Sequence, residues 1–303
     1  MARRPTGRSP RVCLSFPAVA TRPPAVAAGD ENRAAANDKP KPAQPADEQS
    51  EKDSKKAVDS LLEQFAGAEF FWQQADVARE LIALGDPAII PRVAKCLETP
   101  DRRRKCNAAL VLAALGDKRG LPVIIGELQD TKPRPTERRR SDNKPYPEGQ
   151  IKDDRYYAAL LLGQLKMKEA VPALIEATAD ATINARAAIS LGEIGEKSAI
   201  PALHKMAEDF PNERLWAGHG LAALGEQEGF DIVSDTAVLD ARWTERRHAV
   251  EALGQFGDRR VVPALKKALK DEERKVRIAA ARSLAKLGDD AALRALDETD
   301  PSK

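Results

Sequence analysis

TERRHAVEALGQFGDRRVVPALKKAL, residues 244–269, decides the fold of this chain. It predicts two short amphipathic helices that meet at Gly257. The apolar residues of each helix fall on one face, namely Ala249, Ala252, Leu253 and Phe256 in the first and Val262, Leu265 and Leu269 in the second. Because a pair of helices this small cannot bury its apolar face alone, we expect it to be one copy among several.

Three residues mark the junction between the two helices. Gly257 suits a helix C-terminus, because glycine adopts a left-handed conformation without steric cost. The carboxylate of Asp258 favours the N-terminus of the next helix. Pro263 lies in the first turn of that helix, where backbone N–H groups have no partner within the helix. The sequence therefore predicts a sharp turn at residues 257–258.

The same pattern recurs along the chain at a nearly constant spacing. An anchor glycine follows Leu, Ile or Phe at Gly85, Gly116, Gly195, Gly225, Gly257 and Gly288. By subtraction, neighbouring anchors are 31, 79, 30, 32 and 31 residues apart, and Lys166, after Leu165, divides the long interval into 50 and 29. A leucine stands four residues before every anchor, at Leu81, Leu112, Leu162, Leu191, Leu221, Leu253 and Leu284. Proline follows six residues after most anchors, at Pro91, Pro122, Pro172, Pro201 and Pro263, whereas Asp231 and Arg294 depart from the pattern.

Self-similarity at this period is typical of a solenoid. We expect an all-α, right-handed α–α superhelix of about seven helix pairs over residues 57–300. The recurring pattern resembles the short HEAT-like repeats of phycobilisome lyases and many bacterial proteins. The segments that carry the resemblance are VRIAAARSLAKLGD (276–289), NARAAISLGEIGEKSAIPAL (184–203) and RRHAVEALGQFGDRRVVPAL (246–265), and it extends over residues 70–296. It implies a HEAT-like fold and little about activity, because solenoids host many functions.

The bulk composition excludes several classes of protein. The chain has 303 residues, a net charge of +2 and 32% charged residues, so it is not an obvious nucleic-acid binder. Its three cysteines form neither a disulfide framework nor a metal-binding spacing. No apolar run reaches the roughly 18 residues that a membrane span needs.

Residues 1–56 differ from the rest of the chain. Several arginines precede a weakly apolar patch at 12–20, followed by small residues suited to a cleavage site. This pattern suits either a poor bacterial export signal or a disordered basic tail, so we leave open whether the protein is exported or cytoplasmic. Residues 30–56 lack apolar periodicity and predict a flexible tether. The ordered solenoid is predicted to begin at Ala57.

The largest irregularity is an insertion at residues 131–152. The distance from Pro122 to Lys166 is 44 residues, against 25 from Pro91 to Gly116. Insertions in solenoids map to one edge, which is often the binding edge. The candidate partner-binding residues are Arg134, Arg138, Arg139, Arg140 and Tyr146, because arginines can grip an acidic partner and tyrosine is enriched in interfaces. The alternative is a tolerated loop without a role.

The three histidines, His204, His219 and His248, raise the possibility of a metal site. Deoxyhypusine hydroxylase, another HEAT-like protein, uses His-Glu pairs to hold two irons. At the corresponding positions this chain has His248-Ala249 and Trp216-Ala217. Since an iron site needs its carboxylates, we predict no metal and no cofactor, and interpret the histidines as surface or groove residues.

A basic residue stands eleven positions before most anchors, at Lys105, Arg155, Arg214, Arg246 and Arg277. These side chains could track phosphates or, as we prefer, form a structural ladder with acids at the same helix starts, namely Asp101, Asp154, Glu213, Glu245 and Glu273. The second helices should line the concave face. Their predicted exposed positions, ten residues after each anchor, are Lys95, Gly126, Glu176, Lys205, Asp235, Lys267 and Glu298. Their mixed signs argue against a nucleic acid as the main ligand.

These observations favour a non-enzymatic scaffold that binds a protein or peptide partner, with an acidic partner as one option. We expect a monomer with no catalytic residues. The alternative is a lyase-like enzyme subunit, which the resemblance to bilin lyases implies. Nucleic-acid binding through the basic tail and the insertion is a weaker third possibility.

Overall fold

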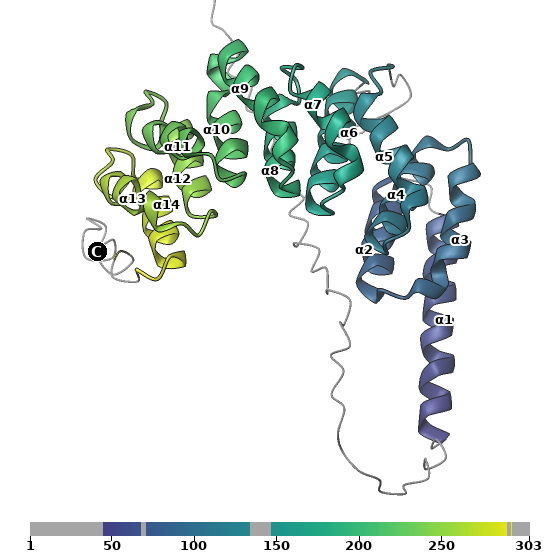
Figure 1. Ribbon diagram of the computed structural model, residues 1–303. Helices are drawn as coiled ribbons and strands as arrows, with labels where there is room; N and C mark the ends of the chain where they lie inside the picture. Colours follow the sequence, from purple (N-terminus) through teal and green to yellow (C-terminus); the bar gives the residue numbers. More distant parts are fainter. Residues whose placement is uncertain (1–44, 68–70, 134–146, 290–291, 293–303) are drawn as a thin grey trace, which may run out of the picture.

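The computed structural model describes residues 45–67, 71–133, 147–289 and 292. Within these ranges every regular element is a helix. The helices follow one another along a curved row from α1 to α14 (Figure 1). This arrangement confirms the predicted all-α solenoid. No helix in the described ranges is long and apolar enough to cross a membrane.

The row is built from pairs of helices. The first helices of the pairs are α2 (Phe71–Leu84), α4 (Arg102–Ala114), α6 (Pro147–Gln164), α8 (Asn184–Ile194), α10 (Arg214–Ala223), α12 (Trp243–Leu253) and α14 (Arg274–Lys286). The second helices are α3 (Ile90–Ala94), α5 (Leu121–Gln129), α7 (Val171–Ala177), α9 (Ile200–Asp209), α11 (Gln227–Leu239) and α13 (Val262–Ala268). The helix α1 (Pro45–Gly67) precedes the first pair.

The helix α1 begins at Pro45, twelve residues before Ala57, where the solenoid is predicted to begin. The polar stretch 45–56 has no apolar stripe, but it contains two Glu–Lys pairs at helical spacing, Glu48–Lys52 and Glu51–Lys55. Such pairs support a helix without burying it. In Figure 1 this end of α1 runs away from the stacked pairs.

Every anchor residue has a left-handed backbone conformation. The φ angles are 62° at Gly85, 82° at Gly116, 84° at Gly195, 90° at Gly225, 68° at Gly257 and 90° at Gly288. Lys166 has a φ of 51° and is the only other residue with positive φ in the described ranges. The assignment of Lys166 as the seventh anchor is therefore confirmed.

Most second helices begin with a short 3₁₀ turn followed by the repeated proline. These turns are η1 (Pro87–Ile89), η3 (Lys118–Gly120), η4 (Lys168–Ala170), η5 (Lys197–Ala199) and η7 (Arg259–Val261). The aspartate after the anchor caps three of them: Asp86, Asp117 and Asp258 each accept a hydrogen bond from the backbone N–H two residues later. Two further 3₁₀ turns, η2 (Lys95–Glu98) and η6 (Pro211–Glu213), lie outside this pattern.

The leucine column forms the centre of the stack. Leu81, Leu112, Leu162, Leu191, Leu221, Leu253 and Leu284 are all 0% exposed. The buried residues fall into three clusters, the first from α1 to α4, the second from α4 to α11, and the third from α10 to α14. Each pair of helices thus packs mainly on its immediate neighbours.

First helices pack very closely where a serine meets a glycine of the preceding repeat. The Ser283 hydroxyl donates to the backbone carbonyl of Val250, 2.9 Å away. A β carbon at Gly254 would lie 2.4 Å from the Ser283 Oγ atom. Ser190 makes the same contact with the Ala159 carbonyl at 2.7 Å, beside Gly163. Glycine near the C-terminal end of these helices, at Gly163 of α6 and at Gly254 directly after α12, is therefore required by the close approach of the next first helix.

The stacking of first helices is interrupted at two places. The helices α6, α8 and α10 stack extensively, as do α12 and α14. In contrast, α4 and α6 make little contact, and α10 and α12 barely touch, because α11 packs against both α10 and α12. The first interruption coincides with the insertion, and the second with the longest second helix, α11.

Candidate binding surface

One side of the second helices is exposed to solvent rather than packed into the core. The six described positions predicted to be exposed, ten residues after each anchor, are all exposed. The residues one helical turn earlier are exposed as well, and these are Pro91, Pro122, Pro172, Pro201, Asp231 and Pro263. Since residues at i and i+4 share one side of a helix, these twelve positions define one surface, which we call the second-helix face. Glu298, the seventh predicted position, lies outside the described residues.

The chemistry of the second-helix face changes along the solenoid. On α5 and α7 it is largely uncharged, with the half-buried Ile125 and Ile175 beside it, and the space around Gly126 is open. On α11 it presents Asp231 and Asp235, and on α13 it presents Lys267. The face can therefore offer apolar, acidic and basic contacts to one extended partner.

Three of the five basic residues that stand eleven positions before an anchor make internal contacts, and these are Arg155, Arg246 and Arg277. Arg155 is 8% exposed, its Nε atom donates to the Leu128 carbonyl at 2.8 Å, and its Nη1 atom pairs with the carboxylate of Asp180 at 2.6 Å. Leu128 is in the preceding repeat, and Asp180 is in the loop that leads to the following one. A single buried guanidinium thus connects the last turn of α5 to the loop between α7 and α8.

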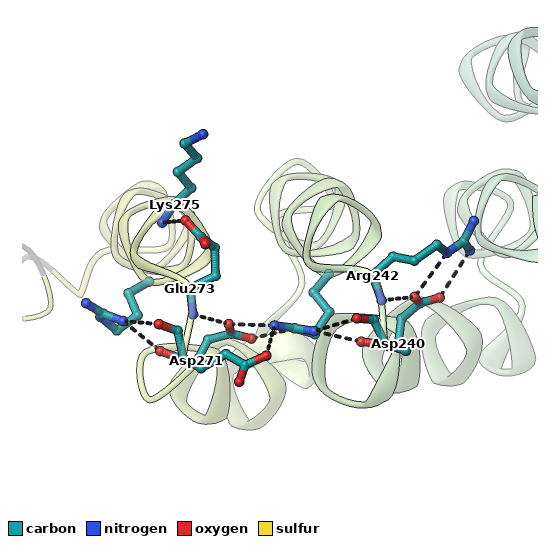
Figure 2. A network of polar contacts seen from close by, with 9 residues as sticks. Asp240, Arg242, Asp271, Glu273 and Lys275 are labelled. Carbon is teal, nitrogen blue, oxygen red and sulfur yellow. Dashed lines mark hydrogen bonds and ion pairs between the residues drawn. The ribbon is translucent and has the colours of Figure 1, made fainter. Parts of the chain in front are cut away.

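Arg246 of α12 repeats this arrangement three helix pairs later, and the residues that it binds, Asp240 and Asp271, are labelled in Figure 2. Its Nε and Nη2 atoms bind both carboxylate oxygens of Asp271 at 2.7 and 2.9 Å, and its Nη1 atom donates to the Asp240 carbonyl at 2.9 Å. Arg277 in turn donates to the Asp271 carbonyl at 2.8 Å. Burial would raise the pKa of Asp271, but hydrogen bonds from Arg246 and from the backbone N–H of Glu273 hold it below its ordinary value.

These contacts support the structural ladder but correct its predicted partners. Arg155 and Arg246 do pair between repeats, but each binds an aspartate 25 residues later, in the loop before the next first helix, rather than one of the predicted acids at the helix starts. The reason is geometric, since the buried guanidinium points across the stack toward the next repeat. The ladder is also incomplete, because Asn184 occupies the equivalent position in α8 and Arg214 is exposed.

The predicted contact residues of the insertion, Arg134, Arg138, Arg139, Arg140 and Tyr146, lie outside the described residues. The structure does describe where the insertion leaves and rejoins the solenoid. At its N-terminal end Asp130 accepts a hydrogen bond from the backbone N–H of Lys132 at 2.9 Å. At its C-terminal end Asp154 of α6 binds Arg102 of α4 at 2.7 Å and Gln150 at 2.7 Å.

The histidines occupy three different environments. His204 is half-buried and lies 3.4 Å from a carboxylate oxygen of Glu228, and the His248 ring lies 5.6 Å from the Trp216 ring. His219 is 8% exposed, which corrects its interpretation as a surface residue. Burial, with a contribution from the charge of Arg186, lowers the pKa of His219 from 6.5 to about 4. Among the described residues no three metal-binding side chains gather into a site.

Two stretches of this chain match a known protein family. The family of HEAT repeats matches residues 150–222 and 233–302. This chain is a HEAT-like repeat protein. The break between its two matched HEAT segments falls at the end of α10 and the start of α11, where the stacking of first helices changes.

Three solved structures are similar to this HEAT-repeat chain. The complex of CpcE and CpcF of phycocyanin lyase from Nostoc sp. PCC7120 shares 17% identity with a TM-score of 0.52, over 89% of this chain and 99% of that one. The Escherichia coli protein YibA has 16% identity and a TM-score of 0.44, over 86% and 92% of the two chains. Human deoxyhypusine hydroxylase has 17% identity and a TM-score of 0.29, over 80% and 99%. No curated protein matches the sequence.

Proposed function

We propose that this HEAT-repeat chain is a non-enzymatic scaffold that binds a protein partner along its second-helix face. The observation that carries the proposal is the unbroken series of twelve exposed positions on six successive second helices. An extended surface of this kind is what repeat proteins use for binding. Its prolines also fix the backbone, so little conformational freedom is lost when a partner binds.

The charge distribution favours a protein over a nucleic acid. A groove that holds a polyanion needs basic residues along its whole length, whereas the second-helix face carries Glu176, Asp231 and Asp235 between its lysines. The arginines that could have tracked phosphates, Arg155 and Arg246, are buried in ion pairs. We infer a partner with alternating charges and an apolar segment.

The fold comparison is compatible with this role. The structure of CpcE and CpcF shows a chain of similar fold in a complex with a second protein. The alternative of a lyase-like enzyme subunit rests on the same shared fold, and a fold by itself does not determine activity. We therefore place protein binding first.

Site-specific photocrosslinking tests the proposal. A photoreactive residue would replace Lys95, Glu176, Lys205 or Lys267 on the second-helix face, and Arg282 or Gln255, both exposed on the side of the first helices, would serve as controls. We expect the same partner to be captured from several second-helix positions and from neither control. Capture from the control positions alone would contradict the proposal.

The insertion is proposed as a second contact for the same partner. Replacing Arg138, Arg139 and Arg140 together by alanine, with Tyr146→Ala in parallel, should reduce the amount of partner captured. Circular dichroism would verify that both variants remain folded. If capture is undiminished, the insertion is not a contact and binding rests on the second-helix face alone.

A further inference from the structure

The junction between α10 and α12 is built differently from the rest of the stack. Whereas α6, α8 and α10 pack directly on one another, as do α12 and α14, the helices α10 and α12 are bridged by rings. The His219 ring of α10 lies 5.1 Å from the Phe256 ring, and Trp216 of α10 lies 5.6 Å from His248 of α12. Phe256 also meets Phe230 of α11 at 5.4 Å. The junction thus depends on contacts of two histidine rings.

His219 is buried in this junction without a polar partner for its inner nitrogen. In the described part of the chain, nothing accepts from or donates to its Nδ1 atom. The charged group that faces the ring is Arg186 of α8, whose guanidinium is held in place by Ser190 at 3.1 Å and Glu193 at 2.6 Å. From the other side the ring meets uncharged Phe256. A proton on His219 would therefore place two positive charges together, away from water.

The other bridging histidine, His248, has charged groups of both signs beside it. The Oε2 atom of Glu245 lies 3.9 Å from His248, and Arg247 lies 3.0 Å from it on the same helix. In contrast, no carboxylate within the described ranges contacts the His219 ring. The charged surroundings of His219 are therefore one-sided, with a guanidinium and no carboxylate.

The buried arginine of α6 and α12 has no counterpart in the two first helices between them. Arg155 joins the end of α5 to the loop after α7, and Arg246 joins the α11–α12 loop to the loop after α13. At the corresponding positions of the intervening repeats stand Asn184, whose side-chain nitrogen has no hydrogen-bond partner in the described structure, and the exposed Arg214. The helix α10 therefore contributes no buried arginine to the junction.

We propose that the α10–α12 junction is an acid-sensitive joint, at which protonation of His219 separates the two helices while the repeats on either side stay folded. The imidazolium can be hydrated only if its ring leaves Phe256. The helix α10 lies at the boundary between two apolar clusters, because it contributes Ala217 and Leu221 to the central cluster and Leu215 and Ala222 to the cluster that contains α12. A separation of α10 from α12 would therefore change the course of the solenoid at this boundary. The joint therefore couples pH to the shape of the proposed binding surface, and its existence does not depend on that function.

The size of the effect follows from proton linkage. The pKa of His219 is about 4 in the closed joint, and an open joint would restore a value near 6.5. The equilibrium constant for opening should then increase about 30-fold between pH 7.5 and pH 5. Above about pH 7.5 the imidazole is almost entirely neutral in both states, so opening should hardly depend on pH there.

Hydrogen-exchange mass spectrometry of the full chain at pH 7.5 and 5.0 tests the proposal, after correction for intrinsic exchange rates. We expect protection in α10 and α12 to fall about 30-fold at pH 5 while α6 and α7 change little. His219→Phe should abolish this response, and His219→Gln is a second variant should phenylalanine not fit. His204→Gln, at a half-buried histidine outside the joint, should respond as wild type does.

Two results would overturn the proposal. One is an acid response that is as large in α6 and α7 as in α10 and α12, or that persists in the His219 variants. The other comes from wild-type protein alone, by NMR titration of its three histidines. A His219 ring that titrates near pH 6.5 without loss of the folded spectrum would show that its charge is tolerated in place.

Discussion

Lys166 has a backbone conformation that the other six repeats assign to glycine. A left-handed conformation costs a side-chain-bearing residue about 1 kcal/mol, which is partly offset by the greater freedom that glycine has in the unfolded chain. The side chain of Lys166 is exposed. The position therefore carries backbone strain that no buried contact explains.

We expect Lys166→Gly to stabilise the protein by about 0.5 kcal/mol. Lys267→Gly is the matched control, because Lys267 is exposed within the helix α13 and glycine there should destabilise by up to about 1 kcal/mol. Urea denaturation would measure both changes. If both variants are destabilised equally, the anchor position has no special backbone requirement.

Leu253 and Leu239 provide a matched pair for the core. Leu253 is 0% exposed and Leu239 is 73% exposed, so the same change removes a buried side chain in one case and a solvated one in the other. Leu253→Ala should cost ~2–5 kcal/mol, and Leu239→Ala should change stability by less than about 0.5 kcal/mol. Thermal or urea unfolding would separate them. Similar losses from both would mean that the leucine column is not the core.

At the level of helix pairs, the glycine that faces a serine controls how closely first helices approach. Gly254→Ala would place a β carbon 2.5 Å from the Ser283 β carbon, so α12 and α14 must move apart at a cost of about 1–3 kcal/mol. Gly126→Ala makes the same chemical change on α5, where nothing lies within 4 Å, and should stabilise by about 0.5–1 kcal/mol. Changes in unfolding free energy of opposite sign would confirm the difference. Ser283→Gly should rescue Gly254→Ala only in part, because the added β carbon would still lie 2.9 Å from the Cα atom of residue 283.

The buried ion pair between Arg246 of α12 and Asp271 in the loop between α13 and α14 gives a prediction about the pH dependence of stability. Arg246→Met leaves the carboxylate of Asp271 buried without its partner and should cost about 3 kcal/mol at pH 7. Because the pKa of Asp271 is lowered in the folded state, its contribution is complete above the ordinary value of 3.8 and is lost as the pH falls through the lowered value. The difference in unfolding free energy between wild type and Arg246→Met should therefore shrink as the pH falls through this acidic range, as urea denaturation at several pH values would show. An advantage that persists at pH 2 would contradict the assignment.

Elements that depend on local pattern could be predicted from the sequence, and those that depend on neighbours could not. The anchors, the leucine column and the six exposed second-helix positions follow from periodicity and from the conformational freedom of glycine. The burial of His219 does not, because it depends on how α10 meets the end of α12. The partners of Arg155 and Arg246 were placed on the wrong acids for the same reason, since a loop 25 residues away supplies them. The start of α1 was missed because charge pairs support it in the absence of an apolar stripe.

For the whole molecule, the division of the core into three clusters affects cooperativity. Contacts between neighbours alone allow parts of a solenoid to unfold separately. Trp243 packs on the C-terminal cluster, whereas Trp216 packs on both the central and the C-terminal cluster. In a variant with Trp72→Phe and Trp216→Phe, the fluorescence of Trp243 would therefore report the unfolding of the C-terminal cluster, while circular dichroism reports the whole chain. We expect the two urea transitions to have different midpoints. Coincident transitions would instead show that the three clusters unfold as one unit.

The repeated backbone conformation at the anchors bears on how repeats can be lost or duplicated during evolution. Each unit ends in the same left-handed residue, and most of the following helices begin with the same 3₁₀ turn. A recombination event that joined Gly225 directly to Asp258 would delete one unit and yet create a junction of the usual kind. Loss or duplication of a unit would then alter the number of helix pairs while leaving the local rules of folding intact. The length of the solenoid is thus a property that evolution can adjust in steps of about thirty residues.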